Sequence, residues 1–150
     1  TEPQQWFVPA FGPGFLLFFL VYNGFGEEIG WRGLALPVLQ HRLGSLGGNI
    51  AVGVIWALWH LPLFWLPGSY QYGDSIILFV LLLTCWSIIM GMLVHKSGGS
   101  IFVAILFHES ANFIAFTLRF PSSHYGYLVW VMAAVLSIVW MPRPYFKWHR

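Results

Sequence analysis

The chain has 150 residues, of which 58% are apolar and only 8% are charged, and its formal net charge is +2. This length fits one domain. A soluble domain carries about 25% charged residues, so the composition excludes a soluble globular enzyme and a disordered tail. The small charge excludes a phosphate-binding surface for nucleic acid. The single cysteine, Cys85, excludes an internal disulfide and a thiolate metal cluster.

Five apolar runs are long enough to cross a bilayer, and short links rich in Gly, Pro and Ser separate them. They cover approximately residues 13–40, 48–66, 75–94, 101–118 and 125–141. No run alternates as a β-barrel strand would, and other backbone in lipid must be helical. We therefore predict an all-α fold, a polytopic transmembrane helical bundle with about five spans. Because the chain begins with Thr1 and shows no signal peptide, we expect one membrane-embedded domain over 1–150 that lacks upstream spans.

The links between the predicted spans carry their Lys and Arg residues mostly on one side of the membrane. With five spans, five cations lie on the same side of the membrane: Arg42, Lys96, Arg143, Lys147 and Arg150. The links on the opposite side contain one cation, Arg119. Positively charged loops lie on the cytoplasmic side, so we expect a cytoplasmic C-terminus. The predicted location is a bacterial or archaeal plasma membrane.

The first predicted span contains two adjacent acids followed by a base. A charge in the middle of a bilayer costs roughly 2.5–3.5 kcal/mol on insertion scales, so such groups face a cavity or one another. Glu28 and Arg32 are four residues apart and share a helix face, which predicts an ion pair. Glu27 points about 100° away from Glu28, so its carboxylate is free for chemistry.

Two other predicted spans carry polar residues at a similar depth. His60 lies in the second span, and His108 and Asn112 lie four residues apart on one face of the fourth. Counted from the cytoplasmic ends of their helices, Glu27 and both histidines lie roughly 12–20 Å deep. We therefore predict that the three helices bring these groups together.

The types of residue in this cluster suit hydrolysis of an acyl bond. A carboxylate and a histidine around one water molecule form a general base. A second histidine and an asparagine amide supply hydrogen-bond donors for the developing oxyanion. Neither Cys85, in an apolar span, nor Ser110, off the His108 face, is a credible nucleophile.

Three motifs in this sequence resemble those of the CPBP family of intramembrane peptidases, which includes CAAX proteases and bacteriocin-processing enzymes and is also called the Abi family. They occur in the family's order and on separate predicted helices, and the resemblance covers roughly residues 14–116. Trp56 stands where the family usually has Phe, a change that we interpret as conservative. The motifs are Glu27-Glu28-x-x-x-Arg32, Trp56-x-x-x-His60 and His108-x-x-x-Asn112.

The resemblance implies a membrane-embedded endopeptidase acting on a membrane-associated peptide, such as a prenylated CAAX tail, a bacteriocin leader or another membrane protein. Glu27 with His60 would activate water. Glu28 would pair with Arg32. His108 and Asn112 would stabilise the oxyanion. Two questions stay open: which of the two glutamates is the base, and whether a zinc ion is held by Glu27, His60 and His108.

Other interpretations of the same residues remain. His108-Glu109-x-x-Asn112 differs from the zinc motif His-Glu-x-x-His by its last residue, and asparagine is a poor zinc ligand. A membrane cytochrome could ligate haem with His60 and His108, although it would not need the acids. A proton-coupled transporter, or a non-enzymatic immunity or scaffold protein, could also use the buried charges.

Overall fold

The computed structural model describes residues 20–118 and 124–141, and these ranges contain helices and links but no strand. The prediction of an all-α helical bundle is confirmed. The start of the first predicted span at residue 13 lies outside the described residues, as do Arg119, Arg143, Lys147 and Arg150. The helices in chain order are η2 (Leu20–Phe25), α2 (Gly26–Glu28), η3 (Ile29–Ala35), α3 (Leu36–Trp59), η4 (Leu61–Trp65), α4 (Ile76–Lys96), α5 (Ile101–Leu118) and α6 (His124–Val139).

The first predicted helix differs from the regular α-helix that we assumed, because η2 and η3 are π-helical turns on either side of α2. The backbone N–H of Leu36 bonds to the carbonyl of Trp31, five residues earlier. The wider turn ends at Ala35, two residues before Pro37, which has no N–H to continue the ladder. Such π-turns are rare and occur often at functional sites.

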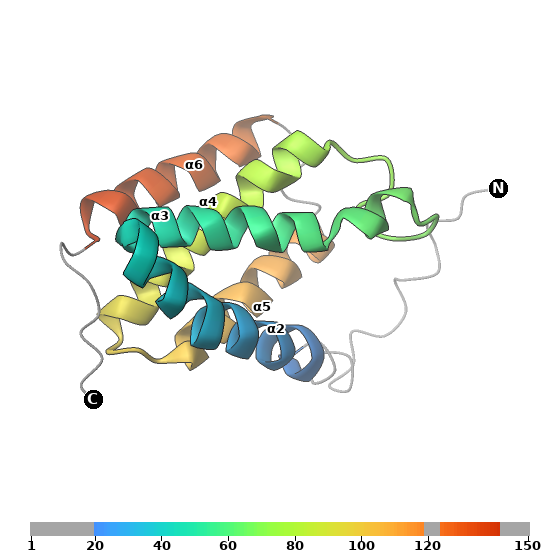
Figure 1. The fold of residues 1–150 in the computed structure, drawn as a ribbon. Helices are drawn as coiled ribbons and strands as arrows, with labels where there is room; N and C mark the ends of the chain where they lie inside the picture. The colour runs from blue at the N-terminus through green and yellow to red at the C-terminus, as the bar shows by residue number, and fades with distance from the viewer. Residues whose placement is uncertain (1–19, 119–123, 142–150) are drawn as a thin grey trace.

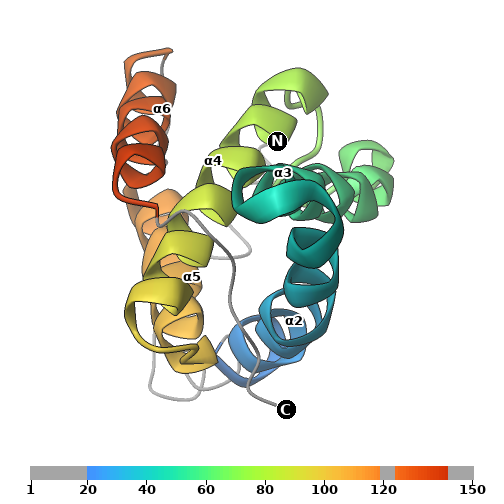
Figure 2. The ribbon, with the colours of Figure 1, turned by 60° about the vertical axis from the view of Figure 1, so that its left-hand side comes forward.

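The predicted break between the first and second spans lies at Gly44. This residue has φ +84° and ψ 164° inside α3, a left-handed region that glycine adopts without steric cost. In Figure 1 the blue-to-teal ribbon runs to the left, and α3 then runs back to the right. The bend therefore divides one long helical segment into two arms that run in different directions (Figures 1 and 2).

The second predicted span changes from one type of helix to another before it ends. The α-helix α3 ends at Trp59, and the short 3₁₀ helix η4 continues the segment to Trp65. Pro62 explains the change, because proline lacks an N–H and disfavours helical backbone at the residue before it. His60 consequently lies at the C-terminal cap of α3 rather than inside a continuous helix.

Helix α4 occupies the middle of the bundle and contacts α3, α5 and α6, while α5 also contacts η2, α2 and η3 (Figures 1 and 2). The bend of α3 and the C-terminal end of α4 lie on the same side of the molecule in Figure 1. This arrangement agrees with the predicted placement of Arg42 and Lys96 at one end of the bundle.

Two helical segments of the described chain are long and apolar enough to cross a membrane: Asn23–Trp65, which includes the bend, and Ile76–Lys96. Shorter apolar stretches lie in α5 and α6, at Ile101–Ala115 and Gly126–Val139. One face of α6 is exposed and apolar, as expected of a surface that lipid covers. This exposed face is formed by Leu128, Val129, Met132, Val135, Leu136 and Val139. The count of five spans stays a prediction.

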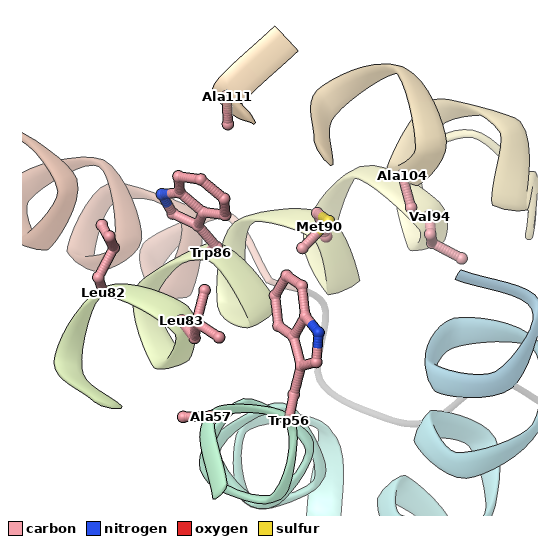
Figure 3. Packing of buried hydrophobic residues seen from close by; sticks show 9 residues of the cluster. All are labelled: Trp56, Ala57, Leu82, Leu83, Trp86, Met90, Val94, Ala104 and Ala111. Atoms are coloured by element: carbon pink, nitrogen blue, oxygen red, sulfur yellow. The ribbon is translucent and has the colours of Figure 1, made fainter. Parts of the chain in front are cut away.

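The core lies between α3, α4 and α5, and α4 supplies most of its side chains (Figure 3). Small residues allow α3 and α4 to approach closely. A Cβ at Gly53 would lie 2.5 Å from the Cα of Thr84, and a Cβ at Gly91 would meet the Asn49 side chain. At the same crossing, the Ser87 hydroxyl donates to the Asn49 carbonyl oxygen at 2.8 Å.

This close approach predicts that Gly53→Ala destabilises the protein by about 1–3 kcal/mol, because the new methyl group meets backbone that cannot rotate away. Gly30→Ala is the matched control, since a Cβ there meets no atom within 4 Å. Alanine is the better helix former by roughly 0.8–1.0 kcal/mol, so the control keeps or gains stability. Thermal unfolding in detergent micelles, followed by circular dichroism, gives the unfolding midpoints of both variants. Equal midpoints for the two variants would contradict the packing described.

Candidate active site

A single carboxylate oxygen joins the first helical segment to α5. Arg32 Nη1 donates to Glu28 Oε1 at 2.8 Å, and His108 Nδ1 lies 2.8 Å from the same oxygen. Glu28, Arg32 and His108 are 0%, 2% and 3% exposed. The predicted Glu28–Arg32 ion pair is confirmed, and His108 is a partner that the sequence did not reveal.

The buried ion pair has hydrogen-bonding capacity left over. Within the described residues, Glu28 Oε2 and the Nε and Nη2 atoms of Arg32 are buried without a hydrogen-bond partner. The guanidinium carbon lies 4.5 Å from the centroid of the Trp56 ring, in a cation–π arrangement. The charge of Arg32 is therefore met by the Glu28 carboxylate and one aromatic face, and Glu27 also interacts with it electrostatically.

Trp56 is the side chain around which the candidate residues gather. Its indole Nε1 donates to Glu27 Oε2 at 2.6 Å, and its backbone carbonyl lies 2.8 Å from His60 Nδ1. Its ring contacts that of His108 edge to face, with centroids 5.0 Å apart. In Figure 3 the indole nitrogen points away from Met90 of α4, towards the blue ribbon of the first helical segment.

The two adjacent glutamates have different surroundings. Glu28 is fully buried and contacts both Arg32 and His108, whereas Glu27 is half-buried and accepts only the indole hydrogen bond among the described residues. Oε1 of Glu27 therefore has no donor within that part of the chain. One carboxylate is fixed in the protein interior, and the other presents an oxygen that a bound molecule can use.

The remaining predicted residues are placed less directly. His60 packs between Trp59 and Phe79, with ring centroids 5.0 and 5.5 Å away. Because Nδ1 lies against the Trp56 carbonyl, it is the protonated nitrogen of the neutral ring, and Nε2 is the one that can accept a proton. Asn112 follows His108 by one turn of α5 and is half-buried, but no described contact joins it to the other motifs.

A third acid, Glu109, lies beside this site. A Cβ on Gly24 would lie 2.8 Å from Ile105 Cγ2 and 3.2 Å from Glu109 Cγ, so glycine suits this close approach of the first helical segment to α5. Glu109 interacts electrostatically with His108, Glu27 and Glu28. Glu109 is therefore an acidic neighbour of the buried cluster.

The predicted metal ligands do not form a metal-binding group in the structure. Among the described residues, no three His, Cys, Asp or Glu side chains are close enough together to hold an ion. Glu27 and His60 are each engaged by Trp56, and His108 Nδ1 is engaged by Glu28.

The shared oxygen predicts that Glu28→Leu lowers the free energy of unfolding by about 3–5 kcal/mol, because it leaves Arg32 buried without a counter-charge. Replacing both partners, as Glu28→Leu with Arg32→Leu, removes the unpaired charge and restores part of this stability. Chemical unfolding in detergent micelles measures both variants, with the exposed Asp74→Ala as control. A double variant less stable than Glu28→Leu would contradict this account.

Comparison with known proteins relates these motifs to a family. A family model described as "Type II CAAX prenyl endopeptidase Rce1-like" matches residues 9–114, a range that includes all three motifs. A curated relative, CAAX prenyl protease 2 of Methanococcus maripaludis, is 35% identical over 131 residues, which cover 81% of this chain and 48% of the relative. The chain thus spans about half the length of that relative. No solved structure gives a significant match.

These matches confirm the resemblance to CAAX-type peptidases on which the sequence interpretation relied. Together with the apolar helices, they identify the chain as an integral membrane protein. The chain belongs to the Rce1-like family of type II CAAX prenyl endopeptidases.

Proposed function

We propose that this protein is an intramembrane endopeptidase that hydrolyses a peptide bond in the prenylated C-terminal tail of a membrane-associated substrate. The family and the printed name of the Methanococcus relative support this substrate class. A bacteriocin leader and an unmodified membrane protein are the alternative substrates. The buried polar cluster supports hydrolysis, because such groups inside a membrane bundle mark a functional site.

The different surroundings of the two adjacent glutamates carry the mechanistic part of the proposal. Glu28 is bound to Arg32 and His108, so it orients the site. Glu27 is half-buried and has one oxygen without a donor among the described residues, so it can receive a proton from water. We therefore assign Glu27 as the general base and Glu28 as a positioning residue.

In the proposed reaction, Glu27 Oε1 and His60 Nε2 orient one water molecule, and Glu27 takes its proton as the oxygen attacks the scissile carbonyl carbon. The resulting oxyanion accepts hydrogen bonds from the Asn112 amide and from His108 Nε2–H. The Glu28 carboxylate, 2.8 Å from Nδ1, orients the His108 ring for this contact. The C–N bond then breaks, and Glu27 returns the proton to the departing amine.

We place the end of the bundle that carries Arg42 and Lys96 on the cytoplasmic side, following the positive-inside rule. The scissile bond then enters between the first helical segment, α3 and α5, in the cytoplasmic half of the bilayer. This access route suits a substrate whose lipid anchor stays in the membrane while its peptide reaches the polar cluster.

The assignment predicts that Glu27→Ala and His60→Ala each lower the rate of cleavage of a prenylated CAAX peptide in proteoliposomes by about 10²–10⁴-fold. Asn112→Ala lowers it by about 10²–10³-fold, because it removes an oxyanion donor. Asp74→Asn, an exposed substitution in the link before α4, retains the wild-type rate. Wild-type rates in Glu27→Ala and His60→Ala would contradict the catalytic assignment.

The same assay distinguishes activation of water by Glu27 and His60 alone from activation by a bound zinc ion. Activation by Glu27 and His60 alone predicts that a strong chelator leaves the wild-type rate unchanged. A zinc ion held by Glu27, His60 and His108 predicts chelator-sensitive cleavage that added zinc restores. The second result would contradict the mechanism that we propose and support the metal alternative.

A further inference from the structure

Trp56 has contacts that simple packing does not require. Its side chain is 1% exposed, so it cannot reach a substrate that enters from lipid or water. Nevertheless its indole hydrogen bonds to Glu27, and its ring lies against both Arg32 and His108. A tryptophan that served only to fill the core would need none of these polar neighbours.

The hydrogen bond to Glu27 joins two helical segments through one atom pair. The donor lies on α3 and the acceptor on α2, 29 residues apart in the sequence, at 2.6 Å. An indole N–H is a donor only, so it can neither accept the proton of the attacking water nor exchange roles during the reaction. It occupies Oε2 and leaves Oε1 for water.

The indole is itself held firmly in place. The guanidinium of Arg32 lies 4.5 Å from the centroid of the Trp56 ring, and the ring of His108 meets it edge to face with centroids 5.0 Å apart. Fixing a carboxylate in this way removes its rotational freedom before the reaction begins. Pre-organisation of a reacting group raises the rate when the geometry is close to that of attack.

From these contacts we infer that Trp56 is a positioning residue, whose indole N–H fixes the Glu27 carboxylate so that Oε1 faces the attacking water. The inference rests on the proposed function, in which Glu27 is the base. It assigns Trp56 no contact with substrate, so its effect is on the chemical step rather than on substrate binding.

Trp56→Phe tests this role, because it removes the N–H and keeps an aromatic ring. The measurement is kcat and KM for a prenylated CAAX peptide with the full-length protein in proteoliposomes. Loss of a hydrogen bond to a charged group predicts a decrease of about 10- to 100-fold in kcat. KM stays unchanged, since the buried indole does not touch substrate.

Trp86→Phe is the matched control. Trp86 is 4% exposed and belongs to the same core cluster, but its Nε1 has no hydrogen-bond partner among the described residues. The substitution removes the same volume without removing a bond to Glu27, so kcat falls by less than about threefold. Equal decreases in kcat in the two variants would show that Trp56 contributes only packing. An unchanged kcat in Trp56→Phe would overturn the inference.

A second measurement does not depend on activity. With ¹⁵N-labelled indoles in detergent micelles, the Trp56 and Trp86 resonances are assigned by their disappearance in the two Phe variants. Glu27→Ala is expected to move the Trp56 indole proton upfield and to leave that of Trp86 in place. If the wild type does not cleave the peptide, the proposed function fails, but this shift still supports the Trp56–Glu27 interaction. If the Trp56 resonance does not move in Glu27→Ala, the inferred Trp56–Glu27 interaction is overturned.

Discussion

The site depends on one buried oxygen, Oε1 of Glu28, which binds Arg32 and His108 at the same time. An isolated charge inside a membrane bundle is costly, so each of these groups stabilises the burial of the others. Because Glu28 and Arg32 lie on the first helical segment and His108 on α5, the interaction also sets how these two elements face each other. The rest of the polar cluster is arranged around this contact.

Trp56 extends the same arrangement to α3. Its ring lies against Arg32 and His108, its indole binds Glu27, and its carbonyl meets His60. Three segments that are distant in sequence thus meet at one aromatic residue. The close approach of α3 and α4 at Gly53 fixes the depth of Trp56 in the bundle. Packing between helices and the chemistry of the cluster are therefore coupled.

The sequence was most informative where a contact is local. Residues four apart on a helix share a face, so the Glu28–Arg32 pair could be predicted from spacing alone. The contacts of His108 with Glu28 and of Trp56 with Glu27 depend on how separate helices rotate against each other, which spacing does not encode. For the same reason, our interpretation of Trp56 as a conservative replacement was incomplete, because phenylalanine has no donor for Glu27. The π-helical turns also escaped prediction, since hydrophobic periodicity does not distinguish them from an α-helix over one turn.

The central claim is that two adjacent glutamates have different tasks, one in chemistry and one in structure. Glu27→Gln and Glu28→Gln change each carboxylate equally, so comparing cleavage rate and unfolding midpoint in the same preparation tests the claim most directly. Our account predicts that Glu27→Gln loses cleavage and keeps the wild-type midpoint, whereas Glu28→Gln lowers the midpoint because Arg32 loses its counter-charge. Full cleavage by Glu27→Gln together with an unchanged midpoint for Glu28→Gln would contradict it.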